Sequence, residues 1–312
     1  PEMSVSVMSA LSADGADIAI GNVVGSNICN VLLILGLSAL IAPLGVTKQM
    51  IRSDVPIMIG VSFLLLLFSL DGQLSKVDSI ILFIGGVTYT LSLIYQSSKQ
   101  SVEHDKFTEE YSLSEPVTLI AWVKNGVYII GGLVLLVLGS RWLVASAITI
   151  AEYFQVSKLI VGLTIVAVGT SLPELFTSVI ASYRGETEIA VGNVLGSNIF
   201  NILAVLGVSG IVAPNGINVS PTVISFDILV MIAVAFACPP IFYSGKRIER
   251  WEGILFLFYY VAYTAYLILD SVDHPALPVF VNIMVLGVIP LTAIALITIA
   301  IMEKRAKSKK TI

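Results

Sequence analysis

The chain alternates between long apolar runs and short polar connections. The runs reach the roughly 20 residues that an α-helix needs to cross the hydrocarbon core of a bilayer. Their apolar residues are continuous instead of alternating with a period of two, which excludes a transmembrane β-barrel. Residues 1–12 look like the second half of one helix. Nine full spans are predicted after it, over residues 18–42, 54–70, 78–96, 117–147, 158–183, 188–213, 222–243, 252–269 and 277–302.

The composition points to the same fold class. Hydrophobic residues make up 56% of the 312 positions and charged residues only 12%, whereas a soluble protein carries about 25% charged residues. The chain therefore has too few charges to cover a surface that faces water. We predict an all-α polytopic membrane protein whose main partner is the lipid bilayer. We expect it to bind no nucleic acid and not to be an enzyme.

Lys and Arg are unevenly distributed over the predicted connections. Of the 17 residues, 14 fall on one side of the membrane and 3 on the other. Because positive residues are enriched in cytoplasmic loops, this bias places the long polar connection 98–116 and the C-terminus in the cytoplasm.

Two segments of the chain are copies of one another. "GNVVGSNICNVLLILGLSALIAP" (21–43) and "GNVLGSNIFNILAVLGVSGIVAP" (192–214) match at 14 of 23 positions without a gap. Upstream, "PEMSVSVMSA" parallels "PELFTSVIAS". Five connections between consecutive predicted helices separate the helix of Glu2 from that of Glu174, after residue 12 and near residues 43, 71, 98 and 148. Because five is odd, the second copy runs through the membrane in the opposite direction. Inverted repeats with broken helices are the architecture in which secondary transporters form a site near the midplane.

This reasoning divides the chain into two inverted five-helix repeats with discontinuous helices and an additional C-terminal span. The predicted parts are the first repeat (1–97, incomplete at its N-terminal end), a cytoplasmic linker (98–116), the second repeat (117–269), the extra transmembrane helix (277–302) and a basic cytoplasmic tail (303–312).

The most unusual stretch is "AVGTSLPELFTSV" (167–179), which places Pro173 and Glu174 inside an apolar run. A carboxylate at mid-bilayer costs roughly 2.5–3.5 kcal/mol on insertion scales, so we expect it to bind something. Pro173 removes a backbone donor and thereby frees carbonyl groups in the preceding turn. Carboxylate, hydroxyl and carbonyl oxygens suit hard cations and are poor ligands for zinc or copper.

The second helix of each repeat adds polar residues at helical spacing. Ser26 and Asn30, like Ser197 and Asn201, are four residues apart and therefore share one face of a helix. The glycine before each serine allows close helix packing. Two inverted copies are expected to converge around a pseudo-two-fold axis. The predicted cation site comprises Glu2, Ser26, Asn30, Thr170, Ser171, Glu174, Ser197 and Asn201.

Structural interpretations compete with these functional ones. A proline can simply kink a helix, Ser or Thr can bond the carbonyl group four residues earlier, and Asn can bond between helices. Asp54 and Asp227 also correspond between the repeats, but each is predicted at a helix start, where N-capping explains it. Asn27 and Asn198 fit either interpretation and are left out of the predicted site.

The repeated motifs resemble the α-repeats of the calcium/cation antiporter superfamily, in particular the prokaryotic sodium/calcium exchangers. The matching text is "PEM" with "GNVVGSNICN" and "AVGTSLPEL" with "GNVLGSNIFN", and the resemblance runs from residue 1 to about 269. Members of that family have ten helices. By this comparison the chain would lack the first helix and half of the second, and span 277–302 would be an addition.

The resemblance implies exchange of Na⁺ for Ca²⁺ by alternating access in a prokaryotic plasma membrane, with both ions as substrates and no cofactor. It also implies that the carbonyl group of Ala167 joins the predicted ligands, and we expect the monomer to be the functional unit. Potassium-dependent relatives carry Asp where this chain has Asn30 or Asn201, so the sequence argues against K⁺ co-transport.

Three other functions compete with Na⁺/Ca²⁺ exchange as interpretations of these residues. Proton-coupled Ca²⁺ exchangers usually carry an extra acidic residue shortly after the Gly-Asn pair, where this chain has Val-Val-Gly and Val-Leu-Gly. A cation channel could use the same oxygens but usually needs symmetric subunits, whereas the duplication already supplies pseudo-symmetry within one chain. An intramembrane aspartyl protease needs a membrane-embedded Asp pair, and the sequence predicts none.

Overall fold

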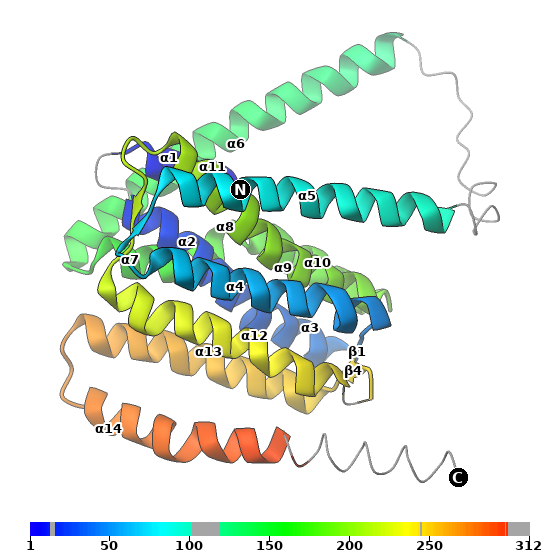
Figure 1. Cartoon of the computed structure of the whole chain (residues 1–312). Helices are drawn as coiled ribbons and strands as arrows, with labels where there is room; N and C mark the ends of the chain where they lie inside the picture. Colours follow the sequence, from blue (N-terminus) through cyan, green and yellow to red (C-terminus); the bar gives the residue numbers. More distant parts are fainter. Residues whose placement is uncertain (13–15, 102–118, 244, 297, 299–312) are drawn as a thin grey trace, which may run out of the picture.

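The protein, described by a computed structural model, is almost entirely helical (Figure 1). Within the described residues, seven helices are long and apolar enough to cross a membrane. A further span is broken, because Lys158–Thr170 and Leu172–Tyr183 meet at an angle of 46°. The predicted fold class, a polytopic helical membrane protein with discontinuous helices, is confirmed. The structure describes residues 1–12, 16–101, 119–243, 245–296 and 298.

In its described residues, the first half of the chain contains seven helical segments, two of them π-helical, and two very short strands. Its elements are α1 (Glu2–Ala10), α2 (Ala16–Cys29), the π-helical η1 (Asn30–Leu35), α3 (Gly36–Ile41), β1 (Leu44–Gly45), the π-helical η2 (Met50–Asp54), α4 (Val55–Ser69), β2 (Gln73–Leu74) and α5 (Lys76–Ser101).

The second half begins with a long helix and three short helical segments, then repeats this order, and ends with an additional helix. Its elements are α6 (Leu119–Phe154), α7 (Lys158–Val161), the π-helical η3 (Gly162–Val166), α8 (Ala167–Thr170), α9 (Leu172–Tyr183), α10 (Thr187–Phe200), the π-helical η4 (Asn201–Leu206), α11 (Gly207–Val212), β3 (Ile217–Asn218), the π-helical η5 (Val223–Asp227), α12 (Ile228–Tyr243), β4 (Arg247–Ile248), α13 (Arg250–Ser271), α14 (Leu277–Asn282) and the π-helical η6 (Ile283–Val288).

Corresponding elements of the two halves have matching lengths. α2 and α10 both contain 14 residues, η1 and η4 both contain 6, and α3 and α11 both contain 6. The halves also interlock, since α3 packs against α13 and, in the equivalent place, α11 packs against α5. In the same way α1 contacts η4 and α9 contacts η1. Each half therefore completes the packing of the other, as expected for inverted repeats.

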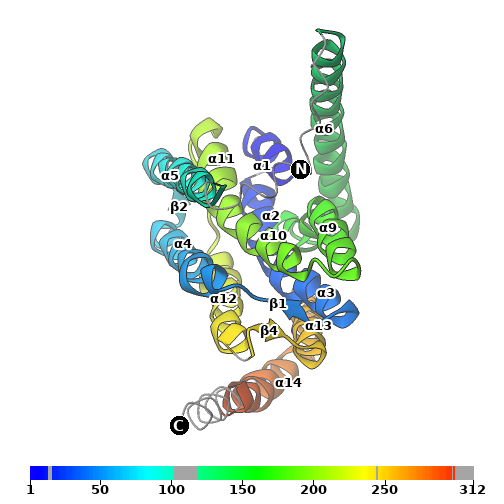
Figure 2. The same cartoon turned by 90° about the vertical axis from the view of Figure 1, so that its right-hand side faces the viewer.

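The helices that carry the two Gly-Ser-Asn motifs lie at the centre of the bundle (Figure 2). In the most apolar stretch of Ala16–Ile41, 78% of the residues are buried, against 0% for Leu277–Leu296 at the periphery. Exposed side chains on the outer helices are large and apolar, among them Leu67, Ile84 and Leu286. The central helices instead bury polar groups, which is the distribution expected for a protein surrounded by lipid.

Two short antiparallel ribbons tie the halves together. β1 pairs with β4, in the register Leu44 with Ile248, and β2 pairs with β3, in the register Leu74 with Ile217. Both ribbons are formed by the short connections between predicted spans. The two-residue strands are too short to carry a periodicity that a sequence pattern could reveal.

Some predicted boundaries are corrected by the structure. α5 continues to Ser101, so the boundary predicted at residue 97 falls inside a helix. α6 continues to Phe154, beyond the predicted end at 147, and stops where Gln155 adopts a left-handed φ of 54°. The length of an apolar run predicts only the part of a helix that crosses the hydrocarbon core. The helices themselves continue beyond the apolar run until a turn ends them. The rest of the linker (102–118) and the basic tail (303–312) lie outside the described residues.

The N-cap prediction for Asp54 and Asp227 is wrong. The helices that contain them begin at Lys48 and Pro221, so both carboxyl groups lie about two turns inside a span. The hydroxyl group of Tyr263 donates to Asp227 Oδ1 at 2.9 Å, and Asp227 Oδ2 and Asp54 Oδ1 are buried without a partner. Membrane-embedded Asp residues therefore exist, but Asp227 is bonded to a tyrosine and not to Asp54, unlike a protease dyad.

Replacing Tyr263 by Phe is expected to lower the free energy of unfolding by about 1–3 kcal/mol, because it leaves a buried acceptor without its donor. The measurement is the melting temperature of the purified protein in detergent. Tyr243→Phe is the control, since Tyr243 lies at the end of α12 with 59% of its surface exposed. Equal melting temperatures for the two variants would contradict the expectation.

Candidate cation site

The broken span creates the first part of the candidate site. α8 ends at Thr170, and Ser171 has φ −86° and ψ 5° before α9 begins at Leu172. Pro173 lies in the first turn of α9, where its missing N–H is tolerated, and Glu174 follows in the same turn. The helix breaker therefore starts a new helix, and it places polar groups from both sides of the break in the interior.

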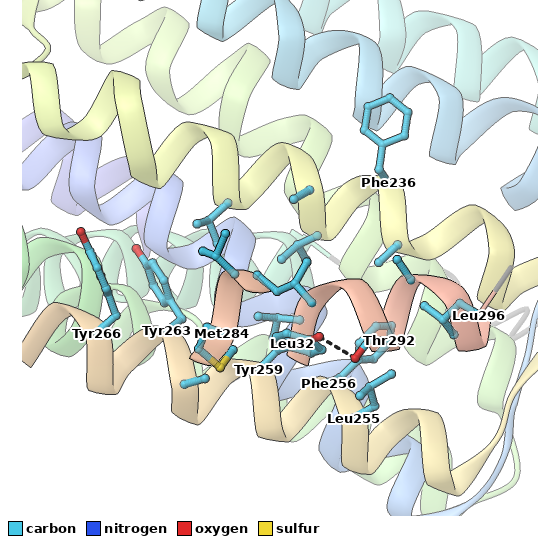
Figure 3. A pocket seen from close by; sticks show the side chains of 18 of the residues that line it. Leu32, Phe236, Leu255, Phe256, Tyr259, Tyr263, Tyr266, Met284, Thr292 and Leu296 are labelled. Atoms are coloured by element: carbon cyan, nitrogen blue, oxygen red, sulfur yellow. Dashed lines mark hydrogen bonds between the residues drawn. The ribbon is translucent and has the colours of Figure 1, made fainter. Parts of the chain in front are cut away.

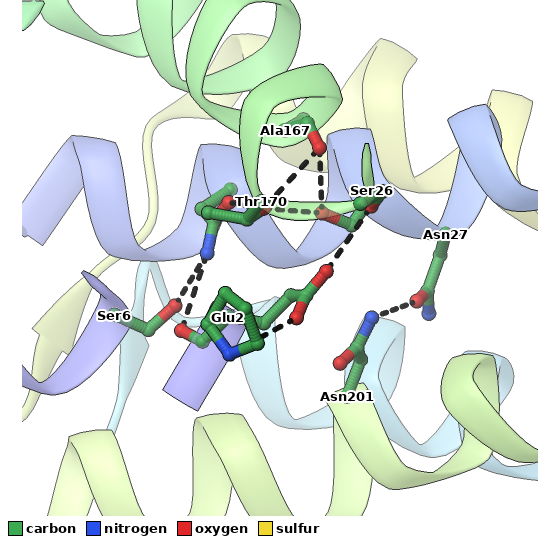
Figure 4. Close-up of polar contacts among 10 residues, drawn as sticks. Glu2, Ser6, Ser26, Asn27, Ala167, Thr170 and Asn201 are labelled. Carbon is green, nitrogen blue, oxygen red and sulfur yellow. Dashed lines mark hydrogen bonds and ion pairs between the residues drawn. The ribbon is translucent and has the colours of Figure 1, made fainter. Parts of the chain in front are cut away.

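Hydroxyl groups from α2 and α8 meet at this break (Figure 4). Ser26 Oγ lies 3.4 Å from both the Ala167 carbonyl oxygen and Thr170 Oγ1. Thr170 Oγ1 donates to Asn22 Oδ1 at 2.9 Å and lies 3.2 Å from the same Ala167 oxygen. Because a hydroxyl group has one proton, Thr170 can satisfy only one of these acceptors at a time. Ser26 has only long contacts, so its lone pairs are available to a cation.

The predicted free carbonyl of Ala167 needs a correction. Its oxygen accepts the backbone N–H of Ser171 at 3.1 Å, in addition to the two hydroxyl contacts. A carbonyl oxygen has two lone pairs, so the donors around this oxygen compete. It can still face a cation, provided that the hydroxyl groups turn away.

Glu2, the first residue of α1, contacts the broken span through Ser171. Its side chain is 8% exposed, and Ser171 Oγ donates to its Oε1 at 3.2 Å. Glu174 is half-buried, and its Oε2 is a buried atom without a partner. Ser171, the donor to Glu2, is the N-cap of α9, and Glu174 lies in the first turn of that helix, so both carboxylates belong to the region around this break. In the part of the chain that the structure describes, no Lys or Arg side chain pairs with either of them.

Two asparagines outside the predicted site, Asn22 and Asn193, contact the helices that carry Glu2 and Glu174. Asn22 Nδ2 donates to Ser6 Oγ at 2.9 Å and lies 3.4 Å from the Glu2 carbonyl oxygen. In the second repeat Asn193 Nδ2 donates to Ser178 Oγ at 3.1 Å and lies 3.4 Å from the Glu174 carbonyl oxygen. The sequence feature that marks these two asparagines is the Gly-Asn pair, which is present in both copies of the repeat.

The remaining predicted ligands lie on α10 and at the start of the two central π-helical segments. Asn30 is the first residue of η1 and Asn201 the first residue of η4. π-Helical turns are rare and occur frequently at functional sites. Asn30 Oδ1 is buried without a partner. Ser197 is half-buried on α10, one turn before Asn201 and on the same face.

The structure thus joins five predicted residues in one hydrogen-bonded cluster: Glu2, Ser26, Ala167, Thr170 and Ser171. Asn30 and Asn201 belong to an asparagine network. Glu174 lies in the first turn of α9, directly after the break, and Ser197 lies on α10. Buried acceptors without donors, such as Asn30 Oδ1 and Glu174 Oε2, are costly. A bound cation would supply the missing partner. The donor set contains only oxygen and up to two negative charges, which suits Na⁺ or Ca²⁺.

The prediction that the glycine before each serine allows close helix packing holds in the first repeat only. A Cβ atom on Gly25 would lie 2.5 Å from the Leu163 oxygen and 2.8 Å from the Ala167 Cβ, so α2 packs closely against η3 and α8 there. A Cβ atom on Gly196 would meet nothing within 4 Å in the described part of the chain. Close approach is therefore required at Gly25 and not at Gly196.

The structure also contains an apolar cavity that is lined by none of these residues (Figure 3). It has a volume of about 710 Å³ and separates α12 and α13 from η6 and the helix that continues after it. The side chains that line it are apolar apart from three tyrosines and Thr292, which accepts a hydrogen bond from Tyr259 Oη at 2.7 Å. Among these described lining residues none is charged, so this cavity is unsuited to a cation.

Comparison with known proteins identifies the family. The sodium/calcium exchanger protein family matches residues 1–97 and 124–269, which is more than half of the chain. The chain belongs to the sodium/calcium exchanger family. This exchanger is therefore a member of a family of transporters, for which Na⁺ and Ca²⁺ are substrates. The resemblance found in the repeated motifs is confirmed.

Individual relatives cover most of the exchanger. It is 40% identical to the putative antiporter CaxA of Alkalimonas amylolytica over 87% of this chain and 84% of that protein. It is 31% identical to the sodium/calcium exchanger MaX1 of Methanosarcina acetivorans over 84% and 83% of the two chains. A solved structure of the sodium-calcium exchanger NCX_Mj, soaked with 2.5 mM Na⁺ and 0.1 mM Ca²⁺, matches with a TM-score of 0.58 and 29% identity over 85% of this chain and 82% of that one.

Proposed function

We propose that the protein is a secondary active antiporter that exchanges Na⁺ for Ca²⁺ by alternating access. The observation that carries this proposal is the pair of carboxylates, Glu2 and Glu174, in the first turns of the equivalent helices α1 and α9 of two inverted repeats. A hydroxyl group contacts Glu2, and Glu174 Oε2 and Asn30 Oδ1 are buried acceptors without a partner. In this proposal residues 1–97 and 117–269 act as the two repeats, and 277–302 anchors the chain. The ligands are those predicted from the sequence, including the Ala167 carbonyl group.

The proposed mechanism is competition for charge neutralisation. One Ca²⁺ or several Na⁺ ions neutralise the two carboxylates. An empty site carries uncompensated charge in a medium of low dielectric constant, which is too costly to occlude. The switch between the inward-open and outward-open states therefore occurs only with a loaded site, and this requirement couples the two fluxes.

Apolar packing beside the site supports Na⁺ over H⁺ as the driving ion. The positions after the two Gly-Asn pairs hold Val23, Val24, Val194 and Leu195, all of which are at most 1% exposed. They leave no acidic group there to exchange a proton. The charge bias further supports a prokaryotic plasma membrane with the central linker and C-terminus in the cytoplasm, and one chain contains both repeats, so a monomer suffices.

The test uses the full-length protein in proteoliposomes. Vesicles loaded with Na⁺ are diluted into Na⁺-free buffer, and Ca²⁺ entry is followed against matched vesicles that carry only a pH gradient. We expect Ca²⁺ entry with the Na⁺ gradient alone. Entry driven only by the pH gradient would assign the protein to proton-coupled exchange, and entry without any gradient coupling would indicate a channel.

A further inference from the structure

Asn27 and Asn198, the third residues of the two Gly-Ser-Asn motifs, form a reciprocal contact between the repeats. Asn27 Nδ2 donates to the Asn198 carbonyl oxygen at 3.2 Å, and Asn198 Nδ2 donates to the Asn27 carbonyl oxygen at 3.1 Å. The two side chains are 2% and 3% exposed. They lie on the central helices α2 and α10, so the contact is in the middle of the bundle (Figure 2).

These backbone contacts fix which way each carboxamide points. A carbonyl oxygen can only accept, so the Nδ2 atom of each asparagine must face it and Oδ1 must face away. The same Nδ2 atoms also contact methionine sulfur, Met231 Sδ at 3.6 Å for Asn27 and Met58 Sδ at 3.7 Å for Asn198. The orientation of the pair is therefore determined by groups outside the candidate site.

The fixed oxygens in turn orient two candidate ligands. Asn201 Nδ2 donates to Asn27 Oδ1 at 3.2 Å (Figure 4), and Asn30 Nδ2 donates to Asn198 Oδ1 at 2.9 Å. With its nitrogen used in this way, Asn30 keeps Oδ1 as a buried atom without a partner. The Asn201 oxygen lies on the side of its carboxamide that faces Glu2 in Figure 4.

We propose that Asn27 and Asn198 are positioning residues that commit the carboxamides of Asn201 and Asn30 to presenting oxygen, and not nitrogen, to the cation. The inference rests on the proposed cation site. A carboxamide rotated by half a turn places partly positive N–H groups against a cation, so an unconstrained asparagine is a poor ligand. Groups that orient metal ligands typically change metal affinity about 10–100-fold when removed.

The arrangement is also crossed between the repeats. Asn27, from the first repeat, orients Asn201 of the second, and Asn198 orients Asn30 of the first. A purely structural asparagine pair would affect both ligands alike. A positioning pair affects each ligand through its own contact, and this difference can be measured.

The experiment is a pair of double-mutant cycles on the purified full-length protein in nanodiscs, with the dissociation constant of radioactive Ca²⁺ as the readout. We expect Asn27→Ala to raise this constant about 10-fold or more. In an Asn201→Ala background the same substitution should have less than about 3-fold effect, because the ligand through which it acts is gone. In an Asn30→Ala background the full effect should remain.

Wild-type Ca²⁺ affinity in Asn27→Ala, or an equal effect in both backgrounds, would overturn the inference. Folding is followed separately by elution profile and melting temperature, and Tyr263→Phe shows the affinity of a protein destabilised elsewhere. If Asn27→Ala does not fold, Asn198→Ala tests the mirror-image contact, for which the effect should vanish with Asn30→Ala and persist with Asn201→Ala. Equilibrium binding needs no ion gradient, so these results stand even if the transport test shows H⁺ to be the driving ion.

Discussion

Replacing Glu174 by Gln is expected to abolish Ca²⁺ transport while leaving the protein folded and inserted. The substitution keeps the shape of the side chain but removes one of the two negative charges that face the ion. Losing one member of a buried charge pair costs about 3–5 kcal/mol, which corresponds to a more than about 100-fold loss of affinity. Glu174 Oε2 has no donor to lose, so the neutral side chain is not expected to disturb the fold.

The measurement is Na⁺-dependent Ca²⁺ uptake by proteoliposomes containing the variant, normalised to the amount of folded protein. Glu186→Gln is the matched control, because Glu186 is an exposed residue just beyond the end of α9. It removes the same charge from the chain without touching the site and should transport normally. Undiminished uptake by Glu174→Gln would show that this carboxylate does not carry the cation.

Replacing Gly25 by Ala is expected to damage both stability and ion binding. The added Cβ atom would lie 2.5 Å from the Leu163 carbonyl oxygen, and backbone cannot move aside as a flexible side chain can. Overpacking of this kind costs about 1–3 kcal/mol. The helices that must separate also carry Ser26 and the Ala167 carbonyl group, so we expect Ca²⁺ affinity to fall by about 10-fold or more.

The repeat supplies the control for this variant. Gly196 occupies the equivalent position in the second copy, but a Cβ atom there meets nothing within 4 Å. Gly196→Ala should therefore keep the wild-type melting temperature and Ca²⁺ affinity, or gain slightly in stability because alanine favours the helix. The pair is compared by thermal unfolding in detergent and by equilibrium Ca²⁺ binding. Equal losses in both variants would contradict the expectation, because only the Cβ atom at position 25 would clash with a neighbouring backbone.

The sequence predicted the spans, the duplication and its inversion because each depends on a pattern that is local or repeated. Apolar length located the helices, and 14 matches in 23 positions revealed the two copies. The odd number of connections between the helices of Glu2 and Glu174 then gave the inversion. None of these inferences required knowledge of which side chain touches which.

Features that depend on tertiary contacts were missed or misjudged. Asp54 and Asp227 were assigned as helix caps, because the apolar run begins after them although the helix does not. Asn27 and Asn198 were left undecided, since a polar residue on a buried helix can bind a ligand or another helix with the same spacing. Gly25 and Gly196 have the same sequence context, yet only Gly25 packs closely against a neighbouring backbone.

The crossed packing of the two halves also sets the order in which this protein can mature during synthesis. Ser171, the hydrogen-bond donor to Glu2, follows it by 169 residues in the chain. At a synthesis rate of about 5–20 residues per second, the ribosome needs about 10–30 s to reach it. For that time the first glutamate lies in a half-built helix bundle without its partner. Assembly of the carboxylate pair consequently waits until the second repeat is being synthesised, and the insertion machinery must tolerate an unpaired charge until then.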